Sequence, residues 1–433
     1  MLVKWPTHMP RHSWSVTAAG RHCDVLDIGC GALVMMEGHG PVPMILHTGA
    51  ERLNVSEVEI KPLRRGVAAI TNGGDVSFVI PGPGDTVVAI EGLGDLYILY
   101  DVPDDDRPDP AAPGVRYFGG RQIHDVGELS LGDGEELYVE AGTVLSGAIR
   151  VEGSRGVRVH GRGIIDCSGF ARVHSHPHNF LCERCEDVRL EGLTFIGAVN
   201  WTVKFCCSRA VRAQNLRVIV HGNAHDGIDV NGSSDVVVSR CFVRSDDDCV
   251  AVKSCCSGHD RARPMPDVRD VTVEKCILYS FGGGSAMEMG HEFCCDRVEN
   301  VTWRDIDVLA VHLYGAALSI RNCDAATLAD VLYEDVRVEH HYDAFIVFRI
   351  TKSRFSWPER PEAGHVERVT LRRVVARLSP YNPGYTVSDI GGYDEEHAFE
   401  GVRFENCRYG DRPIRSLDDF AAYAKHAHGL EFA

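Results

Sequence analysis

An octad repeat is the feature that most restricts the fold of this chain. Each octad carries apolar residues at its first, third, sixth and eighth positions. The start-to-start intervals are 23, 25, 35, 30, 30, 38 and 33 residues, and no helical pattern lies between the octads. Strand-type alternation at such a period predicts a right-handed parallel β-helix, because helical repeats would show a 3.6-residue period. The octads are residues 188–195, 211–218, 236–243, 271–278, 301–308, 331–338, 369–376 and 402–409.

A second column of predicted strands runs beside the octads, at residues 226–231, 248–253, 285–290, 316–321 and 344–349. Alternation turns apolar side chains such as Ile228 and Val230 into the core and the residues between them outward. Ionisable groups in register on an outer face suit a glycan-binding cleft along a solenoid. The outward rows are Asp229, Glu288 and Ser319, followed by Asn231, Lys253, Arg321 and Arg349.

The first hundred residues have a different pattern, in which short apolar runs alternate with turn signals. This predicts an antiparallel β-sandwich. The run from Pro103 to Pro113 contains four prolines and four aspartates, so we expect an exposed linker there. The predicted fold is therefore all-β, with a β-sandwich over residues 1–103, a linker over 104–114 and a β-helix over 115–433. Apolar residues at helical spacing predict a short helix over residues 417–428 that covers the end of the last coil.

The charge balance excludes several classes of partner. Lys plus Arg number 45 against 62 for Asp plus Glu, which gives a net charge of −17. Such a chain is poorly suited to nucleic acid or to anionic membrane surfaces. The N-terminal residues contain no apolar core of a secretory signal, and the 16 cysteines do not read as a disulfide framework. We therefore expect a cytoplasmic protein with no membrane span.

Five aspartates gather at the heads of two second-column strands: Asp226 and Asp229 at the first, and Asp246, Asp247 and Asp248 at the second. In successive coils of a β-helix such residues stack about 4.8 Å apart. Clustered carboxylates repel one another and suit acid and base roles, so we interpret Asp226, Asp247 and Asp248 as catalytic. Asp229 or Asp246 taken alone fits a structural role better, because aspartates at turns often accept backbone N–H groups.

At these residues the chain resembles the polygalacturonase-like glycoside hydrolases, a superfamily that includes pectinase-like and dextranase-like β-helices. Ala224-His225-Asp226-Gly227 and Asp246-Asp247-Asp248-Cys249 match two of the family's motifs at the family's spacing. Gly284-Ser285-Ala286 replaces the family's Gly-His-Gly, and Ser319-Ile320-Arg321 replaces Arg-Ile-Lys. The resemblance covers roughly residues 115 to 410, and dextranase-like relatives also carry an N-terminal sandwich.

The resemblance implies an inverting glycoside hydrolase of a plant or microbial poly- or oligosaccharide, with no metal and no organic cofactor. Asp247 would be the general acid, and Asp226 with Asp248 the base that activates water. Because Ser319 replaces the family's galacturonate-binding arginine and Glu288 adds negative charge, we expect a neutral glycan rather than polygalacturonate. The predicted substrate-binding residues are His178, Trp201, His225, Asp229, Lys253, Glu288, His291 and Arg321.

Several of these residues keep more than one interpretation. Trp201 fits buried packing and sugar stacking equally well. Glu288 would hold the catalytic cluster, bind a sugar hydroxyl or shift a neighbour's pKa. The alternating histidines His174, His176 and His178 have metal-ligand spacing, but they lack carboxylate partners, so a substrate hydrogen bond is the better interpretation.

Other functions remain open at the level of sequence. A fructotransferase-like enzyme, a polysaccharide lyase or an epimerase would also use a β-helix. In a lyase the aspartates would hold calcium, and Lys253 or Arg321 would be the base. A non-catalytic glycan-binding solenoid is a further alternative, but it gives the aspartate cluster no task. The sequence leaves the sugar, the linkage and the oligomeric state open.

Overall fold

The computed structural model describes residues 1–170, 178–255, 264–354, 356–377 and 387–433. His174 and His176 lie outside the described residues. The described chain is built almost wholly from strands, with three short 3-10 turns, so the all-β prediction is confirmed. No described helix has the length and apolar character needed to span a membrane.

The first ten strands form two five-stranded sheets, ordered β2-β1-β5-β8-β7 and β3-β4-β10-β9-β6. All their pairings are antiparallel except that of β4 with β10, which is parallel. The elements are β1 (Ser15–Ala18), β2 (Arg21–His22), β3 (Leu26–Asp27), β4 (Ala32–Glu37), β5 (Val42–His47), η1 (Val55–Glu57), β6 (Val58–Lys61), η2 (Leu63–Arg65), β7 (Ile70–Asn72), β8 (Asp75–Ile80), β9 (Thr86–Ile90) and β10 (Gly94–Asp101).

Many buried side chains of these two sheets belong to one hydrophobic core. Alternate residues of a strand point to one face, and in β8 the alternate residues Val76, Phe78 and Ile80 are buried. Val34 and Ile98 contribute to the same core from the other sheet. Residues 102–114, between β10 and β11, form no strand or helix. The predicted limits of the domains and of the linker stay predictions.

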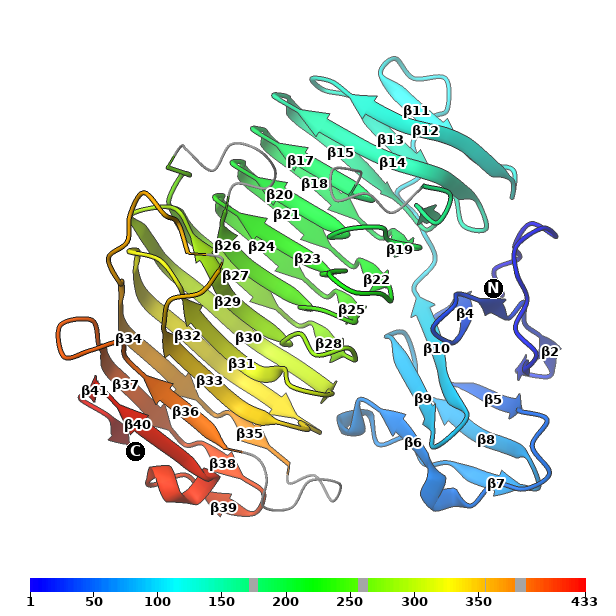
Figure 1. The fold of residues 1–433 in the computed structure, drawn as a ribbon. Coiled ribbons are helices and arrows are strands. Elements are labelled where there is room, and N and C mark those ends of the chain that lie inside the picture. Colours follow the sequence, from blue (N-terminus) through cyan, green and yellow to red (C-terminus); the bar gives the residue numbers. More distant parts are fainter. Residues whose placement is uncertain (171–177, 256–263, 355, 378–386) are drawn as a thin grey trace. The chain divides into compact units, whose positions relative to one another are not determined.

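Strands β11 to β42 follow one another in chain order through a 32-stranded sheet, and Figure 1 shows this series advancing coil by coil from cyan to red. The first half comprises β11 (Val115–Phe118), β12 (Ile123–Leu131), β13 (Glu136–Val139), β14 (Val144–Glu152), β15 (Arg155–Gly161), β16 (Ile164–Asp166), β17 (Phe180–Glu183), β18 (Glu186–Glu191), β19 (Thr194–Ile196), β20 (Val203–Cys206), β21 (Arg209–Gln214), β22 (Arg217–Ile219), β23 (Ile228–Asn231), β24 (Ser234–Ser239), β25 (Phe242–Ser245) and β26 (Val250–Ser254). The second half comprises β27 (Val268–Glu274), β28 (Ile277–Ser280), β29 (Met287–Phe293), β30 (Arg297–Val311), β31 (Ala316–Asn322), β32 (Thr327–Val338), β33 (Ala344–Ile350), β34 (His365–Arg372), β35 (Val375–Ala376), β36 (Ser388–Gly391), β37 (Phe399–Glu405), β38 (Arg408–Tyr409), β39 (Arg412–Pro413), η3 (Leu417–Phe420), β40 (Ala422–Lys425), β41 (Ala427–His428) and β42 (Glu431–Phe432).

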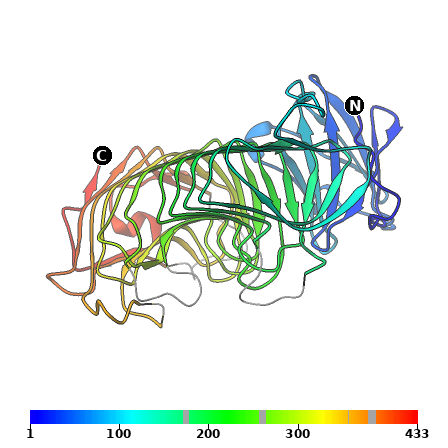
Figure 2. The same ribbon diagram turned by 90° about the horizontal axis from the view of Figure 1, so that it is seen from above.

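The octads stack in register, as the sequence predicts. Val188 pairs with Val211 in parallel, Val211 with Val236, and Val236 with Val271. The same row continues through the first residues of the four later octads. Figure 2 shows the coils following one another with no helix between them. The chain therefore contains the predicted parallel β-helix.

Left-handed turns explain why the apolar positions of an octad are 1, 3, 6 and 8. The fifth residue of every octad has a positive φ, which bends the strand and turns positions 6 and 8 into the core as well. Most of these residues are not glycine, so each turn stores some backbone strain. The fifth residues are Gly192, Asn215, Arg240, Lys275, Asp305, Asp335, Arg373 and Asn406.

The second column is also in register. Ile228 pairs with Val250, Val250 with Met287, Met287 with Leu318 and Leu318 with Ile346. All five side chains are fully buried, which confirms that this row points into the core. The residues that lie between these buried positions, such as Asp229 and Glu288, are consequently also aligned in rows across successive coils.

The predicted C-terminal helix over residues 417–428 is wrong. Only the single 3-10 turn η3 forms, and it ends at Ala421, whose φ is 50°. The following residues form β40, which pairs in parallel with β36, and β41, which pairs with β37. The chain therefore adds further strands to the stack, because the unpaired backbone groups of β36 and β37 bind these residues more strongly than a short isolated helix would.

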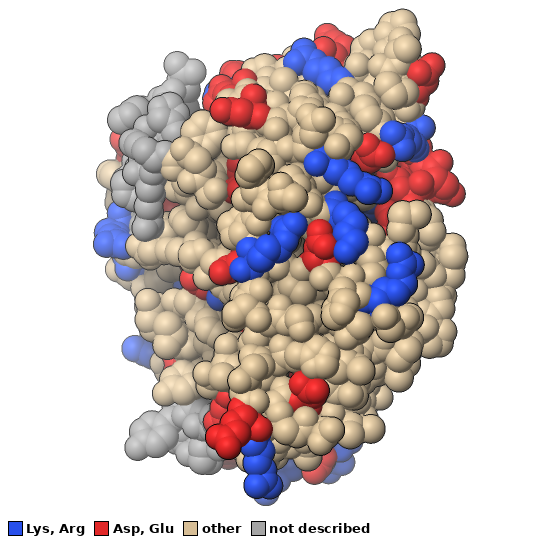
Figure 3. Space-filling model, turned by 90° about the vertical axis from the view of Figure 1, so that its right-hand side faces the viewer, with Lys and Arg blue, Asp and Glu red and all other residues tan. Residues whose placement is uncertain are grey.

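Charged residues on the outer faces pair between coils. Arg304 pairs with Glu334 at 2.9 Å, and Arg368 with Asp330 at 2.7 Å. Cross-strand pairs of opposite charge contribute modestly to a sheet, at about 0.2–1 kcal/mol each. The face drawn in Figure 3 likewise carries Lys and Arg interspersed with Asp and Glu, without a continuous field of either sign.

Candidate active site

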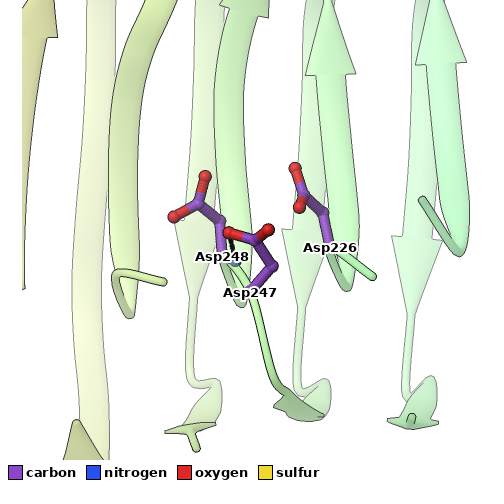
Figure 4. A group of neighbouring side chains, drawn as sticks. All are labelled: Asp226, Asp247 and Asp248. Carbon is purple, nitrogen blue, oxygen red and sulfur yellow. Dashed lines mark hydrogen bonds between the residues drawn. The ribbon is translucent and has the colours of Figure 1, made fainter. Parts of the chain in front are cut away.

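Three aspartates meet where two adjacent coils enter their second-column strands. Asp226 precedes β23 and Asp248 precedes β26, and the pairing of Ile228 with Val250 brings the two aspartates into one row. Asp247 lies one residue earlier on the turn. One carboxylate oxygen of each aspartate lies within 4.8 Å of one from each of the others. Figure 4 shows the three side chains projecting to the same side of the turns.

The three aspartates differ in exposure. Asp226 and Asp248 are buried, whereas Asp247 is half-buried. Asp248 accepts a 2.8 Å hydrogen bond from the N–H of Ser285, and Asp247 accepts one of 3.1 Å from the N–H of Asp248. Burial raises the pKa of both Asp226 and Asp248.

Lys253 is the cation of this cluster. Its ammonium lies 2.6 Å from Asp226, 3.4 Å from Asp229 and 3.8 Å from Asp248, and it is itself buried. Burial alone would lower the pKa of Lys253, but the three carboxylates outweigh it and raise that pKa. The same ammonium opposes the effect of burial on Asp226 and favours its carboxylate form.

Asp229 is fully buried, although it belongs to a row that is predicted to face outward. The ammonium of Lys253 lies 3.4 Å from its carboxylate. Burial raises the pKa of Asp229. Lys204, in the preceding coil, is the strand-register partner of Asp229 and is also buried. The sequence interpretation missed Lys204. The signal was present, because Val203-Lys204-Phe205 has the same alternation as Ile228-Asp229-Val230 one coil later.

Glu288 and Arg321 form a second charged pair beside the aspartates. A guanidinium nitrogen of Arg321 lies 2.9 Å from Glu288 and 3.3 Å from the hydroxyl of Ser285. Glu288 is fully buried, so this row, like Asp229, is covered and not exposed. Burial alone would raise the pKa of Glu288, but Arg321 and His291 together lower it. Glu288 therefore carries a negative charge that neutralises Arg321.

The two predicted histidines near the site have different surroundings. His225 is buried on the turn before Asp226, and its Nδ1 lies 2.6 Å from the carbonyl oxygen of His221. His291 lies on β29, where it pairs with Asn322. It is half-buried, and burial lowers its pKa. Only His291 of these two is open to a ligand.

Trp201 lies on the other side of the aspartates, at a group of cations. The ammonium of Lys253 is 4.1 Å from the centre of its ring, and that of Lys204 is 4.8 Å away. His178 Nδ1 lies 2.7 Å from the carbonyl oxygen of Trp201. Burial, followed by the charge of Lys204, lowers the pKa of His178 to about 3, so this histidine is neutral at ordinary pH. Cation–π contact orients the Trp201 ring next to the cluster.

Asp246 has the structural surroundings expected for it. Its carboxylate lies 2.5 Å from Arg244 and accepts a 2.8 Å hydrogen bond from the N–H of Gly222. It thus ties two adjacent turns together.

The three aspartates also have the spacing of cation ligands. Calcium takes six to eight oxygen ligands in proteins, and the ammonium of Lys253 already lies 2.6 Å from Asp226. A divalent cation would therefore have to compete with Lys253 for these oxygens.

The family model of the glycosyl hydrolases family 28 matches residues 139–348, the region that holds all three aspartates. The predicted resemblance to polygalacturonase-like glycoside hydrolases is thereby confirmed, and residues 139–348 are similar to that family. A probable polygalacturonase of Arabidopsis thaliana is 30% identical over 104 residues, which are 23% of this chain and 23% of the relative. The alignment thus spans less than a quarter of that relative.

Solved structures share the fold. Dex49A from Penicillium minioluteum has a TM-score of 0.67 at 11% identity, over 100% of this chain and 96% of its own. A polygalacturonase from Erwinia carotovora ssp. carotovora has a TM-score of 0.51 at 14% identity, over 71% of this chain and 86% of its own. At these identities the likeness concerns the fold.

Proposed function

We propose that the protein is a glycoside hydrolase that cleaves O-glycosidic bonds of a plant or microbial polysaccharide or oligosaccharide. The observation that carries this proposal is the meeting of Asp226, Asp247 and Asp248 within the region that matches the glycosyl hydrolase model, with the buried ammonium of Lys253 beside Asp226 and Asp248. Glycoside hydrolysis requires one carboxyl that donates a proton and another that acts as a carboxylate.

The exposures of the aspartates suggest their roles. Asp247 is the most exposed of the three and would donate a proton to the leaving oxygen. Asp226, whose carboxylate form the ammonium of Lys253 favours against the effect of burial, would orient and deprotonate water together with Asp248. Attack by that water from the opposite face of the sugar would invert the anomeric configuration.

The spacing of the aspartates favours a second candidate mechanism. Their closest oxygens lie within 4.8 Å, whereas inverting enzymes usually separate the two carboxyl groups by about 6.5–9.5 Å and retaining enzymes by about 5–5.5 Å. In a retaining reaction one aspartate would attack the sugar carbon directly. An NMR time course of the first product separates the two mechanisms, since only inversion gives the opposite anomer at first.

The charges beside the aspartates support a neutral glycan as substrate. Arg321, the one cation at the altered third and fourth motifs, is neutralised by Glu288 at 2.9 Å, and Ser319 offers no charge. A uronate carboxylate would therefore gain little from this side of the site and would meet the charge of Glu288.

The same contacts argue against a lyase. Its base would be Lys253 or Arg321, but both are engaged by carboxylates, at 2.6 Å and 2.9 Å. A calcium-dependent lyase would lose activity with a chelator and form an unsaturated, ultraviolet-absorbing product. The proposed hydrolase would do neither.

A screen of neutral polysaccharides, polygalacturonate and aryl glycosides, with product analysis, tests the proposal. We expect new reducing ends and saturated products, with a neutral glycan cleaved faster than polygalacturonate. Faster cleavage of polygalacturonate would refute the neutral specificity alone. Binding without turnover on every glycan would refute the hydrolase and favour a glycan-binding solenoid.

A further inference from the structure

We propose that Tyr314 and Tyr342, here named the aromatic strip, form a glycan-binding surface that continues the candidate active site toward the C-terminal coils. The proposal rests on the proposed function and adds where the substrate lies beyond the cleaved bond. The ligand is a run of sugar rings whose apolar faces stack on the two tyrosines.

The backbone places the strip beside Asp247. A Cβ at Gly284 would lie 2.0 Å from the carbonyl carbon of Asp247, and a Cβ at Gly315 would lie 1.9 Å from the carbonyl oxygen of Gly284. The turn of Asp247, the turn of Gly284 and the turn of Tyr314-Gly315 therefore pack directly on one another. Tyr342 lies on the same turn of the following coil, where its N–H bonds the carbonyl of Val311 at 2.8 Å.

The turn between Asp247 and the strip consists of glycines. Gly282, Gly283 and Gly284 contribute no side chain of their own to it. The ring of Tyr314 leans back over this turn, since a Cβ at Gly283 would lie 2.8 Å from a ring carbon of Tyr314. A sugar next to the cleaved bond would thus contact the backbone of the glycine turn and the ring of Tyr314.

The two tyrosines are more exposed than the aromatic residue next to them, Phe281, which is 39% exposed. Tyr314 is 72% exposed and Tyr342 is 47% exposed. Phe281, on the glycine turn, is instead held between Arg244 at 4.8 Å and the ring of His312 at 4.5 Å. Single exposed aromatic residues are common, but two on successive coils beside clustered carboxylates form a directed surface. Tyrosine suits this role, because it offers a rigid apolar face and a polar edge.

Binding measurements test the strip independently of turnover. Calorimetry on the Asp247→Asn protein would use size-fractionated oligosaccharides of increasing length, prepared from the polysaccharide that the wild-type protein cleaves fastest. We expect Tyr314→Ala to weaken binding about tenfold, which corresponds to about 1.4 kcal/mol. Tyr342→Ala should have its effect only on longer oligosaccharides, because this residue lies one coil further from Asp247. Tyr314→Phe, which keeps the ring, should bind like the parent.

Tyr393→Ala is the matched control, because Tyr393 is also exposed, at 51%. It follows its second-column strand, β36, whereas Tyr314 and Tyr342 precede theirs, so it lies at the opposite ends of the strands. If Tyr314→Ala and Tyr342→Ala bind every oligosaccharide as this control does, the aromatic strip is wrong while the hydrolase stands. If the wild-type protein cleaves no glycan, the proposed function fails instead, and the strip fails with it.

Discussion

Lys253 sets the charge of the aspartates around it. Asp226, Asp229 and Asp248 are all buried, and burial raises the pKa of each of them. One ammonium within 3.8 Å of all three carboxylates opposes this effect. A base that activates water must be ionised, so activity should fall as the pH drops through these raised pKa values.

Replacing Lys253 by Met should move the acid side of the activity profile to higher pH, because the pKa of Asp226 rises further without the ammonium. The effect of pH on stability has the opposite sign. A carboxyl whose folded pKa is raised binds its proton more tightly in the folded state, so stability is lost as the pH rises from about 3.8 through the folded pKa. Lys253→Arg keeps the charge and is the control. Profiles of kcat against pH that coincide for the Met variant and the wild type would contradict this role.

Asp247→Asn keeps the shape of the side chain but removes its proton. If Asp247 is the general acid, kcat on a polysaccharide should fall by at least about 100-fold, the lower end of the usual contribution of such an acid. The loss should shrink on aryl glycosides, whose leaving group needs no proton. Asp226→Asn should show no such rescue, because water must still be activated. The reverse pattern of rescue would exchange the two assignments.

At the scale of the elements, the left-handed turn at the fifth position of the octads fixes the direction of the core residues. Lys275 is an exposed example, with a φ of 56° between β27 and β28. Its neighbours Val273 and Cys276 are buried, so a change of the turn would displace core side chains.

Lys275→Val should lower the free energy of unfolding by about 1–3 kcal/mol, because a β-branched residue is strained in the left-handed region. Lys275→Gly removes the same charge without that strain and should stay close to the wild type. Denaturant midpoints of the two variants measure the difference. Equal midpoints would show that the strain is relieved by local rearrangement.

At the scale of the whole molecule, stability depends on contacts between successive coils. Each coil of a solenoid packs on its neighbours, so the last coil must be covered or leave its strands unpaired. Here β40 and β41 pair with β36 and β37, and the side chain of Phe420 is buried between them and the core.

Removal of residues 415–433 should therefore expose the edges of β36 and β37 and cause self-association. Light scattering during size-exclusion chromatography would detect it. Removal of residues 431–433 alone, which deletes only β42, should leave the protein close to its normal size. A monodisperse product from the longer deletion would show that the preceding coil protects its own edge.

The repeat of apolar residues was sufficient to predict the stack, because burial of one face in every coil leaves a period that survives in the sequence. The rows of Val188 and Ile228 follow directly from that period. The C-terminal helix was mispredicted because short apolar segments have no reliable period, and pairing with β36 outweighs local preference.

The sequence by itself determined the parallel β-helix, its register and the meeting of Asp226 with Asp248, because all three depend on periodic spacing along the chain. Only the tertiary structure decided which of the clustered groups are covered and which are paired. Lys204 and Glu288 acquire their partners from other coils, and the exposure of Asp247 depends on how the glycine turn packs against it. Such contacts arise between residues that are distant in the chain, so no local pattern encodes them.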